Sequence, residues 1–156
     1  MADEDHLSLE MKVSAIRNGT VIDHISSDAT FKVADILQVH QGQHMVLVGV
    51  NLPSARLGKK GIVKIENREL TPDEADKIAL IAPQATLNII RNFKVIGKAR
   101  VKLPERIERI VKCINPRCIT NQQPVTTRFD VVGTSPPSLR CLYCERVMTG
   151  EEIILK

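Results

Sequence analysis

The stretch CINPRC (residues 113–118) and the shorter CLYC (residues 141–144) contain all four cysteines of the chain. A C-x4-C pair followed by a C-x2-C pair presents two sets of thiolates to one tetrahedral ion. Four sulfur ligands satisfy zinc and leave no coordination position for water or substrate. The spacing therefore predicts one structural Zn²⁺ per chain, held by Cys113, Cys118, Cys141 and Cys144.

Iron in the same cage and disulfide bonds are the alternative uses of these cysteines. Nothing else in the sequence favours redox chemistry, and disulfides are rare in reducing compartments. The N-terminal sequence MADEDHLSLE is acidic and polar, unlike a secretory signal. No apolar run approaches the roughly 20 residues that cross a bilayer. These features predict a cytoplasmic protein with no membrane association.

The character of the sequence changes at Lys102-Leu103-Pro104-Glu105, beyond which all the cysteines lie. We place a domain boundary here and predict domains at residues 1–101 and 102–156. The second segment is short and has few aromatic residues, so it buries too little surface to fold without help. Metal binding contributes about 10–16 kcal/mol in small zinc modules. A small all-β domain of the zinc-ribbon or rubredoxin-like type is expected.

The first domain alternates strand and helix signals. Apolar or alternating stretches predict strands at residues 11–17, 45–52 and 62–67, with a turn at Asn18-Gly19, and residues 85–90 and 93–100 supply the last strand. The order β-α-β-β-α-β is typical of the ferredoxin-like split βαβ arrangement. The fold class is therefore α+β, with an antiparallel sheet and two helices in the first domain.

Both predicted helices have start signals. Ser27 or Asp28 caps the first helix, which places Phe31, Ala34 and Leu37 on one face. The second begins at Thr71-Pro72-Asp73-Glu74, where Thr is the cap, Pro occupies the first helical position and Glu follows three residues after the cap. Pro83 ends this helix.

The sequence contains no recognisable catalytic motif. It lacks a Walker loop, a GxGxxG after a strand, a GxSxG and an HExxH. Asp23-His24 is the one adjacent pair of an acid and an imidazole. With a closed metal site, this favours a binding protein over an enzyme.

Four lysines are candidates for binding phosphate groups. Lys59 and Lys60 lie in a glycine-flanked loop, Lys64 lies on the exposed phase of the next strand, and Lys98 lies in the last strand. Phosphate recognition requires several cationic groups that converge from different elements. The pattern alone does not show that these lysines converge.

Several segments occur in an order that is typical of one family. They are GTVIDHI (19–25), GVNLPS (49–54), VKIEN (63–67), APQATLN (82–88), VIGKAR (95–100), LPERI (103–107) and the four cysteines. From about Val13 to its C-terminus, the chain resembles the regulatory chains of aspartate carbamoyltransferase. The resemblance implies a non-catalytic subunit in pyrimidine synthesis. Such chains pair through their N-terminal domains, bind CTP and UTP as inhibitors and ATP as activator, and dock on catalytic trimers through the zinc domain.

The resemblance also implies roles for individual residues. Ile16 would contact the base through its main chain, Asp23 would accept hydrogen bonds from ribose, and Lys64 would lie near the sugar and base. His24, Lys98 and Lys60 would face the phosphates. Asn88, Phe93 and Val95 would complete the pocket wall. In the zinc domain, Asn115 and Glu145 would face the catalytic chain.

Some residues depart from the family pattern: Ser14, Asn18, Phe93 and Arg117 stand where an acid, a base, a frequent Tyr and a small polar residue are expected. The competing hypothesis is a zinc-ribbon accessory protein that binds nucleic acid, since the segment from Lys102 carries nine Lys/Arg against six Asp/Glu. It leaves the LPERI and GTVIDHI segments unexplained. A small sensing repressor is a third possibility, but the sequence shows no helix suited to reading DNA. We expect no nucleic-acid partner.

Overall fold

The computed structural model describes residues 16–156, which form two compact units that meet in sequence at Val101 and Lys102. The strand predicted for residues 11–17 lies almost entirely outside the described residues, as does Ser14.

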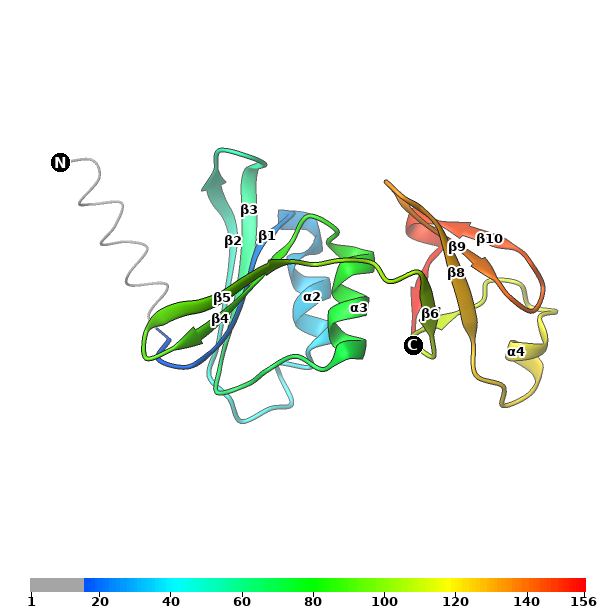
Figure 1. Cartoon of the computed structure of the whole chain (residues 1–156), viewed down its shortest axis with the longest axis horizontal. Helices are drawn as coiled ribbons and strands as arrows, with labels where there is room; N and C mark the ends of the chain where they lie inside the picture. The colour runs from blue at the N-terminus through cyan, green and yellow to red at the C-terminus, as the bar shows by residue number, and fades with distance from the viewer. Residues whose placement is uncertain (1–15) are drawn as a thin grey trace. The chain divides into compact units, whose positions relative to one another are not determined.

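The first unit is a five-stranded antiparallel sheet with two helices (Figure 1). Its strands are β1 (Gly19–Ile25), β2 (Val46–Ser54), β3 (Gly58–Glu66), β4 (Thr86–Arg91) and β5 (Lys94–Arg100), in the spatial order β2-β3-β1-β4-β5. The helices are α2 (Thr30–Ile36), preceded by the 3-10 turn η1 (Ser27–Ala29), and α3 (Pro72–Ile81). The α+β class is confirmed. The last predicted strand is a hairpin of two strands, which adds β5 at the edge.

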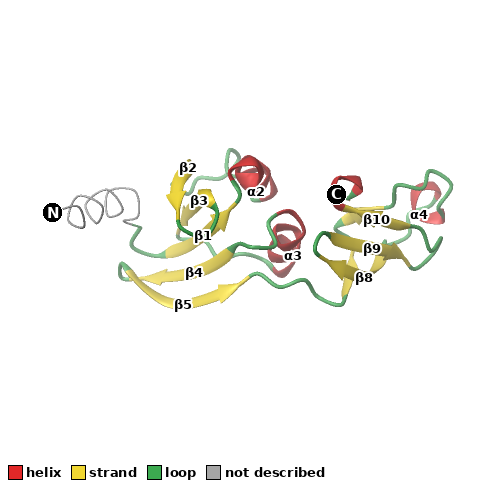
Figure 2. Cartoon of the chain, turned by 90° about the horizontal axis from the view of Figure 1, so that it is seen from above, coloured by secondary structure: helices red, strands yellow, loops and turns green. Residues whose placement is uncertain are grey.

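Both helices cover the same face of the sheet (Figure 2). The core between the layers is formed by buried apolar residues of the sheet and the helices: Ile22, Ile25, Val33, Leu37, Val63, Ile65 and Ile78. The prediction that Phe31 shares the buried face of its helix is wrong, because Phe31 is 63% exposed. Ala34 and Leu37 are buried as expected, and Val33 completes the apolar stripe that Phe31 lies outside.

The ends of the two helices are tied together by Arg68. The capping box predicted at Thr71 is present, with the Glu74 N–H donating to Thr71 Oγ1 and the Thr71 N–H donating to the Glu74 carboxylate. Arg68 also pairs with Glu74 and donates to the Leu37 carbonyl at 2.6 Å, just after α2. The guanidinium of Arg68 therefore satisfies a carbonyl group at the end of α2 and also binds a side chain in the first turn of α3.

We call the sheet face opposite the helices the open face; Val21, Ile62 and Lys64 belong to it because their chain neighbours face the helices. Ile16 packs there with Val21, Ile62 and Ile90 in a second, smaller apolar cluster. The prediction that Lys64 is exposed is wrong, because its residue is only 2% exposed. β3 lies between β1 and β2, so both sides of Lys64 are flanked by strands.

The second unit is built from short strands. A four-stranded sheet has the order β10-β9-β8-β6, and β11 (Ile154–Leu155) pairs with β7 (Val111–Lys112). The four strands are β6 (Arg106–Glu108), β8 (Arg128–Thr134), β9 (Pro137–Cys141) and β10 (Val147–Thr149). The remaining elements are the one-turn helix α4 (Ile119–Gln122) and the 3-10 turn η2 (Gly150–Glu152). The predicted small β domain is confirmed, with these two short helical turns added.

The apolar core of the second unit is small. Its buried side chains include Ile107, Phe129, Leu139 and Met148, which lie on adjacent strands. Among residues 16–156, no helix is long and apolar enough to span a membrane.

Candidate metal centre and nucleotide site

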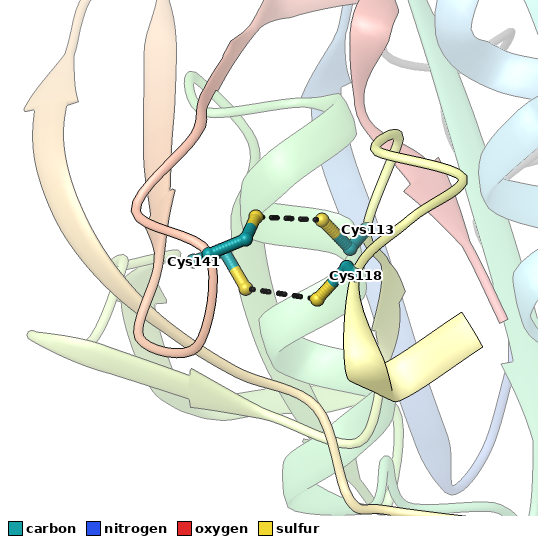
Figure 3. A group of neighbouring side chains, drawn as sticks. Cys113, Cys118 and Cys141 are labelled. Atoms are coloured by element: carbon teal, nitrogen blue, oxygen red, sulfur yellow. Dashed lines mark hydrogen bonds between the residues drawn. The ribbon is translucent and has the colours of Figure 1, made fainter. Parts of the chain in front are cut away.

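The four cysteines come together from two loops of the second unit. Cys113 follows β7 and Cys118 precedes α4, whereas Cys141 ends β9 and Cys144 lies in the turn after it. Figure 3 shows the sulfurs of Cys113, Cys118 and Cys141 gathered between these loops. The Sγ atoms of Cys113 and Cys144 are 3.6 Å apart, and those of Cys118 and Cys141 are 3.8 Å apart. All four sulfurs lie within 4.8 Å of one another.

This spacing fits a tetrahedral metal site. Four Zn–S bonds of about 2.3 Å place neighbouring sulfurs roughly 3.8 Å apart. The cysteines are free thiols, and three of them are buried. Buried thiols from two separate loops, arranged at the edge lengths of a metal tetrahedron, are the donor set of a structural site with no open position.

The thiols differ in how readily they lose a proton. Burial raises the pKa of Cys113 to about 12. Burial also acts to raise the pKa of Cys144, but hydrogen bonds from the Arg146 main chain, the Asn115 side chain and the neighbouring cysteines outweigh it and lower the value to about 7. Only thiolates bind metal, so binding releases protons and is favoured as pH rises.

Polar neighbours fix the loop that carries Cys113 and Cys118. Asn121 Nδ2 donates to the carbonyls of Cys113 and Asn115 at 2.8 and 2.7 Å. Thr120 Oγ1 lies 3.2 Å from the sulfur of Cys118 and donates to it. Contacts of this kind orient metal ligands. Sequence reasoning missed both residues, although they lie only two and three positions after Cys118.

The two residues expected to face a partner lie in the metal loops. Asn115 is half-buried, and its Oδ1 accepts the Arg117 N–H at 3.0 Å. Glu145 is exposed, follows Cys144 and has a left-handed φ of 66°. Arg117 is exposed in the first loop.

A second group of functional side chains surrounds Asp23 on β1 of the first unit. Lys60 Nζ lies 3.0 Å from Asp23 Oδ1 and 3.3 Å from Oδ2. Asp23 Oδ1 also accepts the His24 main-chain N–H at 2.6 Å. The structure therefore brings Asp23, His24 and Lys60 together from strands β1 and β3.

The backbone at His24 turns its imidazole toward β4. His24 has a φ of 58°, and the pairing of β1 with β3 is irregular here. Its Nδ1 lies 3.0 Å from Thr86 Oγ1, a partner that sequence reasoning missed. Burial lowers the pKa of His24; Asp23 acts against this, and Lys60, Arg56 and Lys98 lower it further. The imidazole is therefore neutral at pH 7, within reach of three cations.

Lys64, Asn88 and Lys98 form one row across the open face. The register places Lys64 opposite Val21, Val21 opposite Asn88, and Asn88 opposite Lys98. Residues directly opposite in an antiparallel ladder point to the same face. Lys98 thus lies on a different strand from Lys60, and both are close enough to His24 to affect its pKa.

The remaining predicted residues lie at the other end of the open face. Ile16 is buried, whereas Phe93 and Val95 are 65% and 59% exposed at the β4–β5 hairpin. The Phe93 N–H donates to the Arg17 carbonyl at 2.9 Å, and Val95 lies opposite Ile90. Because Ile90 packs with Ile16, Val95 lies beside the same apolar cluster.

Comparison with known proteins adds two family matches. Residues 11–102 match the family described as the allosteric domain of the aspartate carbamoyltransferase regulatory chain. Residues 105–154 match the family described as its metal binding domain. Together, the two matches cover nearly the whole sequence.

Curated relatives match over almost their full lengths. A chain of Pyrococcus horikoshii is 52% identical over 147 residues, which covers 93% of this chain and 97% of the relative. A chain of Methanothermobacter thermautotrophicus is 50% identical, covering 92% and 93%, and one of Porphyromonas gingivalis is 47% identical, covering 94% and 97%. All three are named aspartate carbamoyltransferase regulatory chain.

Proposed function

Because the chain belongs to the family of aspartate carbamoyltransferase regulatory chains, we propose that it binds CTP or UTP as inhibitors and ATP as activator. Its partner is the catalytic chain, and it is itself a regulatory subunit rather than an enzyme. The nucleotide site is the open face of residues 1–101, and the docking surface belongs to residues 102–156. Regulatory chains pair with one another through their first domains.

The observation that carries the nucleotide proposal is the Lys60–Asp23 ion pair beside His24, with Lys98 in the next row of the same face. The two ammonium groups come from different strands and affect the same imidazole. Together with Arg56, these lysines carry more positive charge than the carboxylate of Asp23 can neutralise. An excess of cations at one end of a sheet suits a polyphosphate anion.

The other end of the open face supplies different chemistry. Phe93 and Val95 offer exposed apolar side chains, the main chain of Ile16 offers polar groups, and Asn88 offers an amide that donates and accepts hydrogen bonds. A nucleoside placed here would direct its phosphates toward His24, Lys60 and Lys98. Asp23 lies at the charged end, one row beyond Asn88, and would accept a ribose hydroxyl if Lys60 turned to phosphate.

Regulation requires that the nucleotide bind two states of the assembly unequally. Coupling between distant sites is typically about 1–3 kcal/mol. Lysines that contact phosphates serve CTP and ATP alike, so discrimination between them must come from groups near the base. Main-chain groups at Ile16 and the amide of Asn88 are the candidates.

The metal of the second domain is Zn²⁺, one per chain. Four thiolates without a carboxylate or imidazole favour zinc over magnesium or calcium. Its role is to hold the two cysteine loops, and with them Asn115 and Glu145, in the shape that a catalytic chain binds.

Lys98→Ala tests the nucleotide site. We expect this change to weaken the binding of both CTP and ATP by roughly one to two orders of magnitude, because loss of a charge-assisted hydrogen bond costs about 1.5–3 kcal/mol. Lys94→Ala, an exposed lysine at the hairpin end of the same strand, is the matched control and should change neither affinity. Calorimetry on the zinc-loaded chain measures both. Unchanged CTP and ATP affinities in Lys98→Ala would remove Lys98 from the site.

A further inference from the structure

Arg56 approaches the same group of charges from the tip of the β2–β3 hairpin. Its Nη2 donates at 3.0 Å to the carbonyl of Gln84, in the turn between α3 and β4. Gln84 and His24 line one small cavity of about 90 Å³. The hairpin tip therefore reaches across the end of the sheet to the segment beside His24.

The partner of Arg56 is a neutral group. Arg68 and Arg91 in the same unit each hold a glutamate. Among residues 16–156, no carboxylate lies within ion-pair distance of Arg56, which is exposed. A guanidinium binds phosphate through two parallel charge-assisted hydrogen bonds, which are about twice as strong as neutral ones. Exchanging a carbonyl for a phosphate is therefore favourable for Arg56.

The strand register orders the groups of the open face along β1. The row of Val21 contains Asn88 and Lys98, and the next row in the same direction pairs Asp23 with Thr86. These rows are about 7 Å apart, two residues at roughly 3.4 Å each. Gln84 precedes Thr86 by two further residues, so Arg56 and Gln84 lie beyond the Asp23 row. A ligand with its base near Asn88 and its phosphates at His24 would end near Arg56.

We propose that Arg56 is a further ligand of the effector, binding the phosphate farthest from the nucleoside and leaving the Gln84 carbonyl when it does so. This inference rests on the proposed nucleotide site. It makes Arg56 a determinant of preference for triphosphates over monophosphates, because a nucleoside monophosphate reaches Lys60 and His24 but not the hairpin tip.

Arg56→Gln separates this role from a structural one. The glutamine amide retains a donor for the Gln84 carbonyl but removes the positive charge. We expect CTP and inorganic tripolyphosphate each to bind about tenfold more weakly to Arg56→Gln than to the wild-type chain. The affinity for CMP should change by less than about twofold. Lys32→Gln, an exposed lysine of α2 on the other side of the sheet, is the matched control and should leave all three affinities within about twofold.

The ligands distinguish failure of this inference from failure of the proposed function. Unchanged CTP and tripolyphosphate affinities in Arg56→Gln overturn the role of Arg56 and leave the nucleotide site standing. An equal loss for CTP and CMP indicates a general structural effect and also overturns it. If the wild-type chain binds tripolyphosphate but no nucleotide, the proposed function fails, and the tripolyphosphate arm still decides whether Arg56 binds phosphate. If wild-type binds neither ligand, both fail.

Discussion

The first unit keeps its shape by packing a sheet against two helices, whereas the second gathers four cysteines around one point. Apolar residues from both layers fill the core of the first, including Ile22, Val63 and Ile78. The second has strands of two to seven residues and a core of few large side chains. The comparison shows how a chain can stabilise a small unit that lacks the area for a hydrophobic core.

The same difference decides where each unit can carry a function. Since the helices cover only one face of the first sheet, its other face is free to hold charged side chains such as Asp23 and Lys98. In the second unit the metal ligands are mostly buried, and only the loops around them are exposed. In the proposed function, the first unit therefore supplies the ligand-binding face, and the second supplies the docking surface.

Removing one metal ligand tests this comparison most severely. Cys141→Ser should abolish metal binding and unfold residues 102–156, because about 10–16 kcal/mol of binding free energy supports such a unit. Calorimetry should then show the first unit melting without the second, and the variant should not be retained by catalytic chains on a sizing column. Metal content is measured on the same sample.

The control for this experiment is Val132→Ser, on an exposed position of β8 in the same unit. This variant should retain its metal, show the thermal unfolding transitions of both units and still bind the catalytic chains. A Cys141→Ser protein that lacks metal yet keeps a folded second unit would show that the apolar core suffices. The contrast between the two units would then be lost.

Truncating the core of the first unit should have a smaller effect confined to that unit. Ile78 is fully buried between α3 and the sheet, so Ile78→Ala should lower the free energy of unfolding by about 2–5 kcal/mol. Phe31→Ala is the control, since this exposed residue should contribute less than about 0.5 kcal/mol. Urea unfolding measures both, and metal content should not change. Loss of metal from Ile78→Ala would mean that the two units do not fold separately.

Phe31 also shows where sequence reasoning reaches its limit. Predictions that rest on neighbouring residues were confirmed. The capping box at Thr71 and the convergence of the cysteine pairs both follow from local spacing. The face on which Phe31 lies depends on where α2 begins, and one residue of phase moves a side chain by about 100°. The prediction that Lys64 is exposed was wrong for another reason. The burial of Lys64 depends on which strands flank β3, and the sequence does not show this.

The proposed nucleotide site depends on contacts that join distant segments. Lys60 and Asp23 are separated by 37 residues, and Arg56 and Gln84 by 28. The sequence shows that these segments carry cations, but only the strand order of the sheet brings them near the imidazole of His24. The resemblance to a family named Lys60 and Lys98 in advance. It did not name Arg56 or Thr86, which the folded chain adds.

The smallest expected effect concerns the pH dependence of nucleotide binding at the open face of the first unit. Burial lowers the pKa of His24 below 6.5, so the imidazole is neutral at pH 7 and gains a proton only in more acidic solution. A bound phosphate stabilises the protonated form and raises this pKa, so CTP binding takes up a proton and strengthens as pH falls. Between pH 7.5 and 6 the gain should stay below about tenfold, the factor that a shift of one pKa unit gives.

His24→Gln isolates this contribution, because the phosphates of CTP also titrate near pH 6 and affect both proteins equally. The amide can still hydrogen-bond to Thr86, so the backbone turn at residue 24 should persist. Calorimetry at several pH values should show a steeper rise in CTP affinity for the wild-type chain than for His24→Gln. Parallel slopes would mean that the imidazole does not face the phosphates. The cations Lys60, Lys98 and Arg56 would then have to bind the triphosphate without it.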